Sequence, residues 1–171
     1  MVHARVVHRS HGGPVRGAVA VHGEAADREQ GGTDYVAMPG TNPVQYEVGF
    51  CAFADAYVRP ILDRLMRDEQ RLIATALTDI NGYLPTHITE RSQAQTDDPA
   101  WNAKYCRNRR NFIDDITRRA LASTKEAMLA TYGMDMGGGN YLPVKNVFVP
   151  LYVNGRRYGN YEMAYRDEAI R

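Results

Sequence analysis

The Asn154-Gly155 pair is the sequence feature that most restricts how this chain can fold. Both residue types adopt positive φ readily, as the two central positions of a type I′ turn require, so the pair predicts the tip of a β-hairpin. Residues 141–153 before the pair carry apolar side chains at every second position in their second half, and residues 156–165 form the returning strand. The chain therefore contains two long antiparallel strands joined by a tight turn.

Three shorter segments also have the composition of strands. Residues 71–78 and 83–88 are β-compatible and are separated by the turn sequence of residues 79–82 (DING), so they predict a second hairpin. Pro85 cannot donate a hydrogen bond to a neighbouring strand, which favours an edge position for the second of these strands. Residues 127–132 complete a predicted set of five antiparallel strands.

The helical signals lie before and between these strands. Residues 45–71 carry apolar side chains at intervals of three and four, the pattern of a long amphipathic helix, and contain a proline that we expect to kink it. Asp98 and Pro99 form an N-cap and first-turn pair for a short helix through residues 101–107, and residues 111–122 predict another. The predicted fold class is α+β, with a long N-terminal helix followed by a five-stranded antiparallel sheet that has a helical insert.

The composition along the chain divides it into four parts. Residues 1–44 are rich in glycine and carry four of the five histidines without the spacing of a structural zinc site, so we expect a flexible leader. Residues 45–71 are the amphipathic helix, whose apolar stripe must pack on the domain or on a second copy of the chain. This makes it a candidate for signalling or dimerisation. Residues 72–166 form the folded domain, and residues 167–171 a short tail.

Charge and hydropathy exclude several classes of function. Lys and Arg total 21 against 20 for Asp and Glu, a formal net charge of +1, which gives no support for a nucleic-acid or membrane-surface partner. No apolar run approaches the roughly 18 residues of a membrane helix, and the first residues lack the apolar core of a secretory signal. We therefore expect a cytoplasmic protein, in which Cys51 and Cys106 are buried, unpaired cysteines.

Four segments of the chain are similar, in the same order, to motifs of one protein family. They are residues 79–87 (DINGYLPTH), 98–110 (DPAWNAKYCRNRR), 135–139 (DMGGG) and 153–159 (VNGRRYG). In these segments the chain resembles the C-terminal Cache/PAS-like sensory domain of bacterial methyl-accepting chemotaxis proteins. It departs from the family pattern at Ile88, where the family has asparagine, and at Arg157-Tyr158, where the family has histidine and tryptophan.

The resemblance implies a PAS/Cache-like fold for residues 72–166 and a sensory function. Such a domain holds a small molecule under the helical insert and passes the signal to a partner through the N-terminal helix. We therefore expect a ligand-binding module of bacterial signal transduction, linked to chemotaxis, which is not an enzyme and holds no cofactor. A homodimer through the N-terminal helix is the expected assembly.

A cluster of three arginines, Arg107, Arg109 and Arg110, is the strongest candidate for a ligand site. The planar guanidinium group pairs in a bidentate way with carboxylates and phosphates, so the cluster predicts an anionic ligand. Neighbouring aromatic side chains, His87 and the strand residue Lys145 extend the candidate site. The predicted ligand-binding residues are Tyr83, His87, Trp101, Tyr105, Arg107, Arg109, Arg110 and Lys145.

Three other functions are compatible with the sequence. His87, the one histidine of the predicted domain, could ligate haem or a metal and make the chain a redox or gas sensor, although no second ligand or haem-attachment motif accompanies it. The apolar stripe of residues 45–71 also fits a dimerisation module that binds no ligand. A hydrolase or transferase that uses Cys106 ranks last, because only His87 is available as a base and no motif supports the pair.

Overall fold

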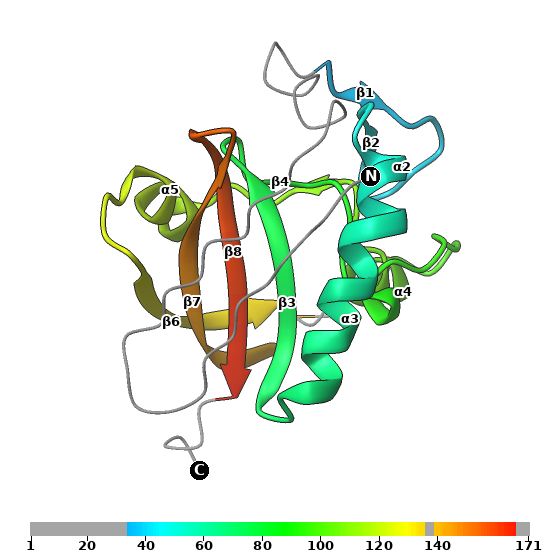
Figure 1. Cartoon of the computed structure of the whole chain (residues 1–171). Helices are drawn as coiled ribbons and strands as arrows, with labels where there is room; N and C mark the ends of the chain where they lie inside the picture. Colours follow the sequence, from blue (N-terminus) through cyan, green and yellow to red (C-terminus); the bar gives the residue numbers. More distant parts are fainter. Residues whose placement is uncertain (1–33, 136–138, 167–171) are drawn as a thin grey trace.

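The long hairpin that the sequence predicts forms the middle of the main sheet. In the computed structural model, β7 (Tyr141–Val153) pairs antiparallel with β8 (Arg156–Arg166). β3 (Leu72–Asp79) pairs with β8, and β6 (Met128–Asp135) pairs with β7, also antiparallel. The strand order is therefore β3-β8-β7-β6, which Figure 1 shows as a twisted sheet with the hairpin at its centre.

Two turns that the sequence predicts are confirmed. Asn154 and Gly155 have φ of 49° and 77°, the positive values that a tight two-residue hairpin turn needs. In the turn after β3, the side chain of Asp79 accepts hydrogen bonds from the backbone N–H groups of Asn81 at 2.7 Å and Tyr83 at 2.9 Å. An aspartate that binds the backbone two residues ahead is the reason that this residue type starts turns.

The structure describes residues 34–135 and 139–166. Most of the leader predicted over residues 1–44 lies outside these ranges, and so does the tail predicted at residues 167–171. Within the described ranges, no helix is both long enough and apolar enough to cross a lipid bilayer.

The last part of the predicted leader packs against the domain. β1 (Val36–Ala37) pairs with β2 (Tyr46–Glu47), and the ring of Tyr35 lies edge-on to the ring of Tyr83 with 4.9 Å between centroids. The hydroxyl of Tyr35 also donates a hydrogen bond to the carboxylate of Asp79. These contacts attach the segment before the helix to the turn that follows β3.

The prediction of a long N-terminal helix over residues 45–71 is wrong. The helical part is shorter and consists of α2 (Cys51–Phe53), the π-helical segment η2 (Ala54–Val58) and α3 (Arg59–Asp68). The residues before it form β2, because β1 is available as a partner strand, and the N–H of Tyr46 also donates to the carbonyl of Arg109 at 2.7 Å. Pro60 lies just after η2 within a helical stretch that is continuous from Cys51 to Asp68, and it has no N–H to donate to the preceding turn.

The apolar stripe of the helical segment packs on the sheet of its own chain. Cys51, Ala54, Val58 and Leu62 are all at most 5% exposed. Full burial of a valine or leucine side chain stabilises a fold by roughly 1.5–3 kcal/mol. The core that they share with the sheet consists of Val48, Phe50, Cys51, Ala54, Val58, Leu62, Leu77, Tyr83, Ile88 and Leu151.

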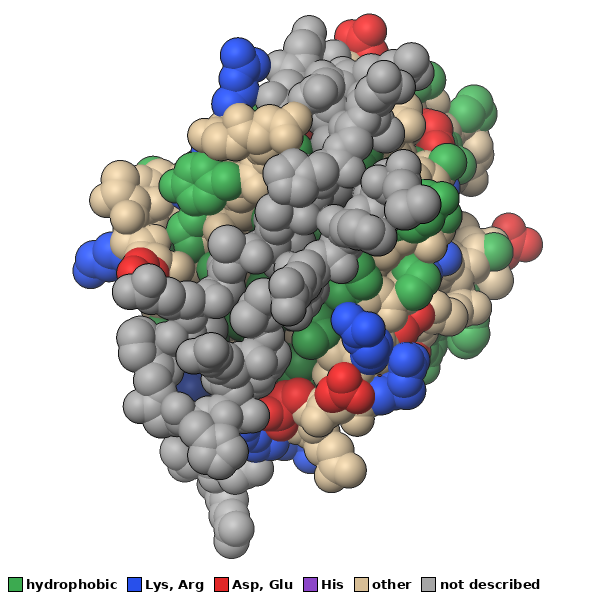
Figure 2. Space-filling model, viewed as in Figure 1, with side chains coloured by type: hydrophobic (Ala, Val, Ile, Leu, Met, Phe, Trp, Pro, Cys, Tyr) green, Lys and Arg blue, Asp and Glu red, His purple; other side chains and the backbone are tan. Residues whose placement is uncertain are grey.

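The outer side of α3 is polar. Arg64, Arg67 and Asp68 are exposed there, and Figure 2 shows charged side chains of both signs in the region of the C-terminal half of this helix. The apolar stripe is therefore used within one chain, so it gives no independent support for the homodimer predicted through this helix, which stays a prediction.

The prediction of a five-stranded, PAS/Cache-like sheet is also wrong, although the α+β class is correct. The segment expected to be the second strand contributes only β4 (Tyr83–Leu84), which pairs with β5 (Arg110–Asn111) in a separate two-stranded ribbon. Pro85 follows β4 directly and has no N–H with which to continue a ladder. The insert supplies a partner strand for β4 instead, and the main sheet keeps four strands.

The insert covers the face of the sheet opposite to α3. Besides β5, it contains the 3-10 turn η3 (Thr89–Arg91), α4 (Pro99–Tyr105) and α5 (Asp115–Ala122). Asp98 caps α4, as predicted, by accepting from the N–H of Ala100 at 2.8 Å. Arg157 of β8 donates from Nη2 to the carbonyl of Ala120 at 3.3 Å, which ties the C-terminal end of α5 to the sheet.

Candidate functional site

A cavity of about 490 Å³ lies between the sheet and the insert. Side chains of all four main strands form its floor, and residues from the segments 84–91 and 103–117 form its roof and walls. Because side chains alternate along a strand, Thr78 and Glu162 face the cavity, whereas Leu77 and Tyr161 of the same two strands face α3.

The wall of the cavity carries a cluster of arginines. Arg107 and Arg110 both lie over the ring of Phe112, each with its guanidinium carbon 4.6 Å from the ring centroid, within the range of a cation–π contact. Arg91 is a third cation of the lining, and its Nη1 donates to the carbonyl of Lys104 at 2.9 Å. The packing of two guanidinium groups against one ring restricts their motion, so their donors are preorganised.

Arg109 takes a different direction from its neighbours. Its backbone is left-handed, with φ of 57°, which turns its side chain away from the cavity that Arg107 and Arg110 line. Its Nη2 lies 2.8 Å from the carboxylate of Asp55, and its Nε lies 2.7 Å from that of Glu47. These two acids raise the pKa of the Arg109 guanidinium against the opposing effect of burial, so Arg109 serves as a fixed link between the insert and the helical segment.

Backbone hydrogen bonds hold the cavity wall together. The N–H of Arg107 donates to the carbonyl of Arg91 at 2.8 Å, and the N–H of Arg109 donates to the carbonyl of Leu84 at 2.7 Å. His87 forms an isolated antiparallel bridge to β3. The two segments that carry the cationic residues are thus joined to each other and to the edge of the sheet.

The floor of the cavity is polar at its centre. The Glu162 carboxylate accepts from the Thr78 hydroxyl at 2.8 Å and from Nδ2 of Asn146 at 3.2 Å. The same Nδ2 lies 3.4 Å from the hydroxyl of Tyr132. Asn146 is only 2% exposed, and its Oδ1 has no hydrogen-bond partner among the described residues. A buried acceptor without a donor is costly, so this atom marks a place where a ligand donor is favoured.

Burial sets the protonation of the floor. It raises the pKa of Glu162 to about 7, and the nearby carboxylate of Asp114 adds to the rise, while the hydrogen bonds from Thr78 and Asn146 oppose it. Burial likewise raises the pKa of Tyr132 to about 12, so its hydroxyl is neutral. Glu162 therefore changes its charge near neutral pH, which is unusual for a carboxylate and is typical of functional sites.

His87 is a neutral donor in the cavity wall. Burial lowers its pKa to about 3, and the positive charges of Arg107, Arg91 and Arg59 lower it further. Its Nδ1 accepts a hydrogen bond from the N–H of Ile88 at 2.8 Å, so the proton of the neutral ring lies on Nε2. His87 thus adds a neutral N–H to the cavity that it lines.

Of the eight ligand-binding residues predicted from the sequence, the cavity brings together three, namely Arg107, Arg110 and His87. Arg109 points away from it, as described above. Lys145 lies on β7 next in sequence to the cavity residue Asn146, so its side chain belongs to the other face of the sheet.

The three predicted aromatic residues lie outside the cavity lining. Tyr83 is fully buried in the core on the side of the helical segment, where its hydroxyl donates to the carbonyl of Tyr46 at 2.5 Å. The rings of Trp101 and Tyr105 on α4 contact each other in a tilted arrangement, with 4.4 Å between centroids and 43° between planes. Trp101 is 38% exposed, so this pair forms the outer side of the insert.

Sequence reasoning missed the polar floor. Asn146 and Glu162 lie in the two strands of the predicted hairpin, β7 and β8. Asn146 pairs with Ala164 and Phe148 with Glu162, so the two polar residues are diagonal neighbours on one face of the hairpin. Polar side chains at diagonal positions of two central strands are the signal that could have found them. Phe112 and Asp114 gave no such signal, because they lie between β5 and α5.

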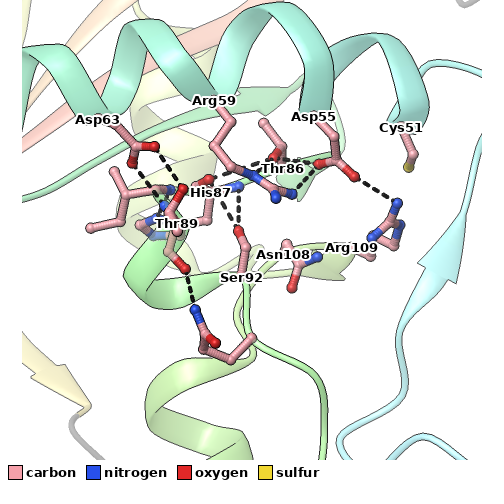
Figure 3. A network of polar contacts seen from close by, with 12 residues as sticks. Cys51, Asp55, Arg59, Asp63, Thr86, His87, Thr89, Ser92, Asn108 and Arg109 are labelled. Carbon is pink, nitrogen blue, oxygen red and sulfur yellow. Dashed lines mark hydrogen bonds and ion pairs between the residues drawn. The ribbon is translucent and has the colours of Figure 1, made fainter.

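A network of ion pairs joins the cavity wall to the helical segment (Figure 3). Asp55 of η2 accepts from the Thr86 hydroxyl at 2.6 Å and pairs with both Arg109 and Arg59. About two turns further along, the Asp63 carboxylate accepts from the backbone N–H of Thr89 at 2.8 Å. Thr86 and Thr89, which lie before and after His87 in the chain, are thus attached to the helical segment.

The donor sets that would hold a metal are absent from the described part of the chain. No group of three or more His, Cys, Asp or Glu side chains there is arranged to bind an ion. Cys51 and Cys106 are both fully buried and unpaired, as predicted. Burial raises the pKa of each thiol, which opposes formation of the reactive thiolate. The haem alternative through His87 stays a prediction.

Comparison with known proteins gives no family to which the chain can be assigned. It matches no family model, and it matches none of the curated proteins.

The pH dependence of stability tests the environment assigned to Glu162. The folded chain holds the Glu162 proton up to about pH 7, whereas the unfolded chain releases it near an ordinary pKa of 4.5. The contribution of Glu162 to the free energy of unfolding therefore falls as pH rises through this window. Between pH 5 and pH 8, we expect the free energy of unfolding of Glu162→Gln to rise by roughly 1–2 kcal/mol relative to that of wild type. This is less than the full pKa shift implies, because Glu162 is half-buried rather than fully enclosed.

Urea unfolding of both proteins at several pH values measures this difference. The opposite slope from His87, whose folded pKa is lowered, is common to wild type and variant and cancels in the comparison. A difference that stays constant from pH 5 to pH 8 would contradict the assigned environment.

Proposed function

We propose that the domain formed by residues 34–166 is a ligand-binding sensory module of bacterial signal transduction, and that its ligand is a small anion. The observation that carries this proposal is the pair of arginines, Arg107 and Arg110, fixed on the ring of Phe112 at the wall of a 490 Å³ cavity. The volume lies in the range of small-molecule sites in proteins.

The charge of the lining supports an anionic ligand. Three arginines, Arg91, Arg107 and Arg110, stand against two acids, Asp114 and Glu162. The pKa of Glu162 is about 7, so part of its negative charge is absent at neutral pH. The Asp114 carboxylate accepts from the N–H of Thr117 at 2.7 Å as the N-cap of α5, which uses part of its hydrogen-bonding capacity.

The network around Asp55 supports a sensory role. A ligand that pulls on Arg107 or Arg110 acts on a wall whose neighbouring residues, Thr86 and Arg109, are held by Asp55 of the helical segment. π-Helical stretches such as η2 are often found at functional positions in helices. If the ligand binds one position of the cavity wall more tightly than another, its binding would shift the wall and, through Asp55, the helical segment.

The resemblance of four motifs to the sensory domain of chemotaxis receptors supports the same function. On this proposal the chain is cytoplasmic, binds rather than transforms its ligand, needs no cofactor, and passes the signal through a homodimer.

Thermal unfolding against a panel of small anions tests the proposal. The panel contains mono- and dicarboxylates, amino acids, inorganic phosphate and nucleotides, with neutral and cationic analogues as controls. We expect at least one anion to raise the midpoint by roughly 5 °C or more at a hundred-fold excess over its Kd. Hydrogen exchange with that anion should also slow in the helical segment, residues 51–68. An unchanged midpoint across the whole panel would reject the function.

A further inference from the structure

The cavity has two ends of opposite chemistry. The wall carries the donors of Arg107 and Arg110, whereas the floor carries acceptors, the Glu162 carboxylate and the unpartnered Oδ1 of Asn146. A simple anion matches the wall only. The floor would then be left with a buried acceptor that has no donor and with a carboxylate in a poorly hydrated place.

Building on the proposed function, we infer that the ligand is a small zwitterion, which places its carboxylate at Arg107 and Arg110 and its ammonium group at Glu162 and Asn146. An ammonium group has three N–H donors and no acceptor. The floor offers it one charged acceptor in Glu162, one neutral acceptor in Oδ1 of Asn146, and the oxygen of Tyr132 next to them. Charge-assisted hydrogen bonds of this kind are the strong ones.

The floor also selects against other anions. A dicarboxylate that reaches the floor brings a second negative charge to Glu162, and the Asp114 carboxylate already raises the pKa of Glu162. An alkyl carboxylate avoids this repulsion but leaves Oδ1 of Asn146 without a donor. Among these three kinds of carboxylate, only the zwitterion brings donors to the floor and a carboxylate to the arginine wall.

Three matched series of probes test the inference by calorimetry on the whole chain. The zwitterions are glycine, β-alanine and γ-aminobutyrate. Each is compared with the carboxylate in which a methyl group replaces the ammonium, and with the dicarboxylate of the same spacing. We expect one zwitterion to bind at least ten-fold more tightly than both of its partners, because a charge-assisted hydrogen bond is worth about 1.5–3 kcal/mol.

Proton release gives a readout that needs no variant. At pH 6.5 Glu162 is partly protonated, and an ammonium group beside it favours the ionised form, so zwitterion binding should release protons. Titrations in two buffers of different ionisation enthalpy measure that release. The methyl-ended carboxylates should release none.

The variant Glu162→Gln separates the two ends of the site. It should reduce the preference for the zwitterion to less than about two-fold while the methyl-ended carboxylate binds at least as well as to wild type, because the arginine wall is unchanged. If methyl-ended carboxylates or dicarboxylates bind wild type as tightly as the zwitterions, the inference is overturned and the proposed anion site stands. If only phosphates or nucleotides bind, the zwitterion inference is overturned and the proposed anion site stands. If no anion binds, the zwitterion inference and the proposed function are both overturned.

Discussion

Replacing Gly159 by alanine is expected to destabilise the domain by at least about 3 kcal/mol, an effect at the upper end of those found for single substitutions. Gly159 lies in β8 between Asp79 of β3 and Leu151 of β7. A Cβ atom added there would lie 1.8 Å from the carbonyl oxygen of Thr78 and 2.7 Å from Cα of Asp79. Backbone atoms cannot move aside as a flexible side chain can, so β3 must separate from β8.

The loss should extend to the turn after β3, because Asp79 holds that turn and also binds Tyr35. Urea unfolding followed by circular dichroism measures the effect. Gly49→Ala is the matched control, since an added Cβ there meets nothing within 4 Å, and it should change stability by less than about 1 kcal/mol. A Gly159→Ala protein with wild-type stability would show that β3 and β8 do not approach as described.

Removal of the two cavity arginines is expected to weaken anion binding by at least about a hundred-fold. Arg107 and Arg110 share the ring of Phe112 and together form the charged wall, so the double variant R107M/R110M removes the electrostatic partner of the ligand. Loss of two charge-assisted contacts of about 1.5–3 kcal/mol each supports this magnitude. Methionine keeps an unbranched apolar stem against the ring, so the packing of the insert is largely kept.

Arg118→Met is the control for the loss of charge. Arg118 is 59% exposed on α5, where it pairs with Asp115 at 2.7 Å, and it isn't part of the cavity lining. We expect its affinity for the anion to stay within about two-fold of wild type, since exposed ion pairs contribute little. Calorimetric titration with the anion of the panel that binds wild type most tightly measures the affinity of the double variant and of Arg118→Met. Equal losses in the control and in the double variant would mean that the effect is one of net charge.

The parts of the fold that depend on local chemistry could be predicted from the sequence. The turn at Asn154 and Gly155 and the cap at Asp98 each follow from residues that are adjacent in the chain. The sheet and the helix could not be predicted fully, because each depends on a distant partner. Residues 83–84 leave the main sheet for a partner near Arg110, and residue 46 joins a strand rather than a helix because β1 is available to it.

The candidate site could likewise be predicted only in part from the sequence. The arginine cluster is visible as a run of charges, but its division into cavity residues and Arg109 depends on the positive φ of Arg109, which no propensity of arginine indicates. Lys145 and Asn146 are neighbours that face opposite sides of β7, and the sequence alone does not say which side is covered by the insert. The floor therefore became visible only when the strands were placed.

An NMR titration of the arginine side-chain Nε–H signals measures whether Arg107 and Arg110 bind an anion at the cavity wall. As the tightest anion of the panel is added, the Nε–H signals of Arg107 and Arg110 should shift together and saturate at its Kd, while that of Arg118 stays in place. Saturable shifts confined to other arginines, with Arg107 and Arg110 unmoved, would show that the anion binds elsewhere than at this wall.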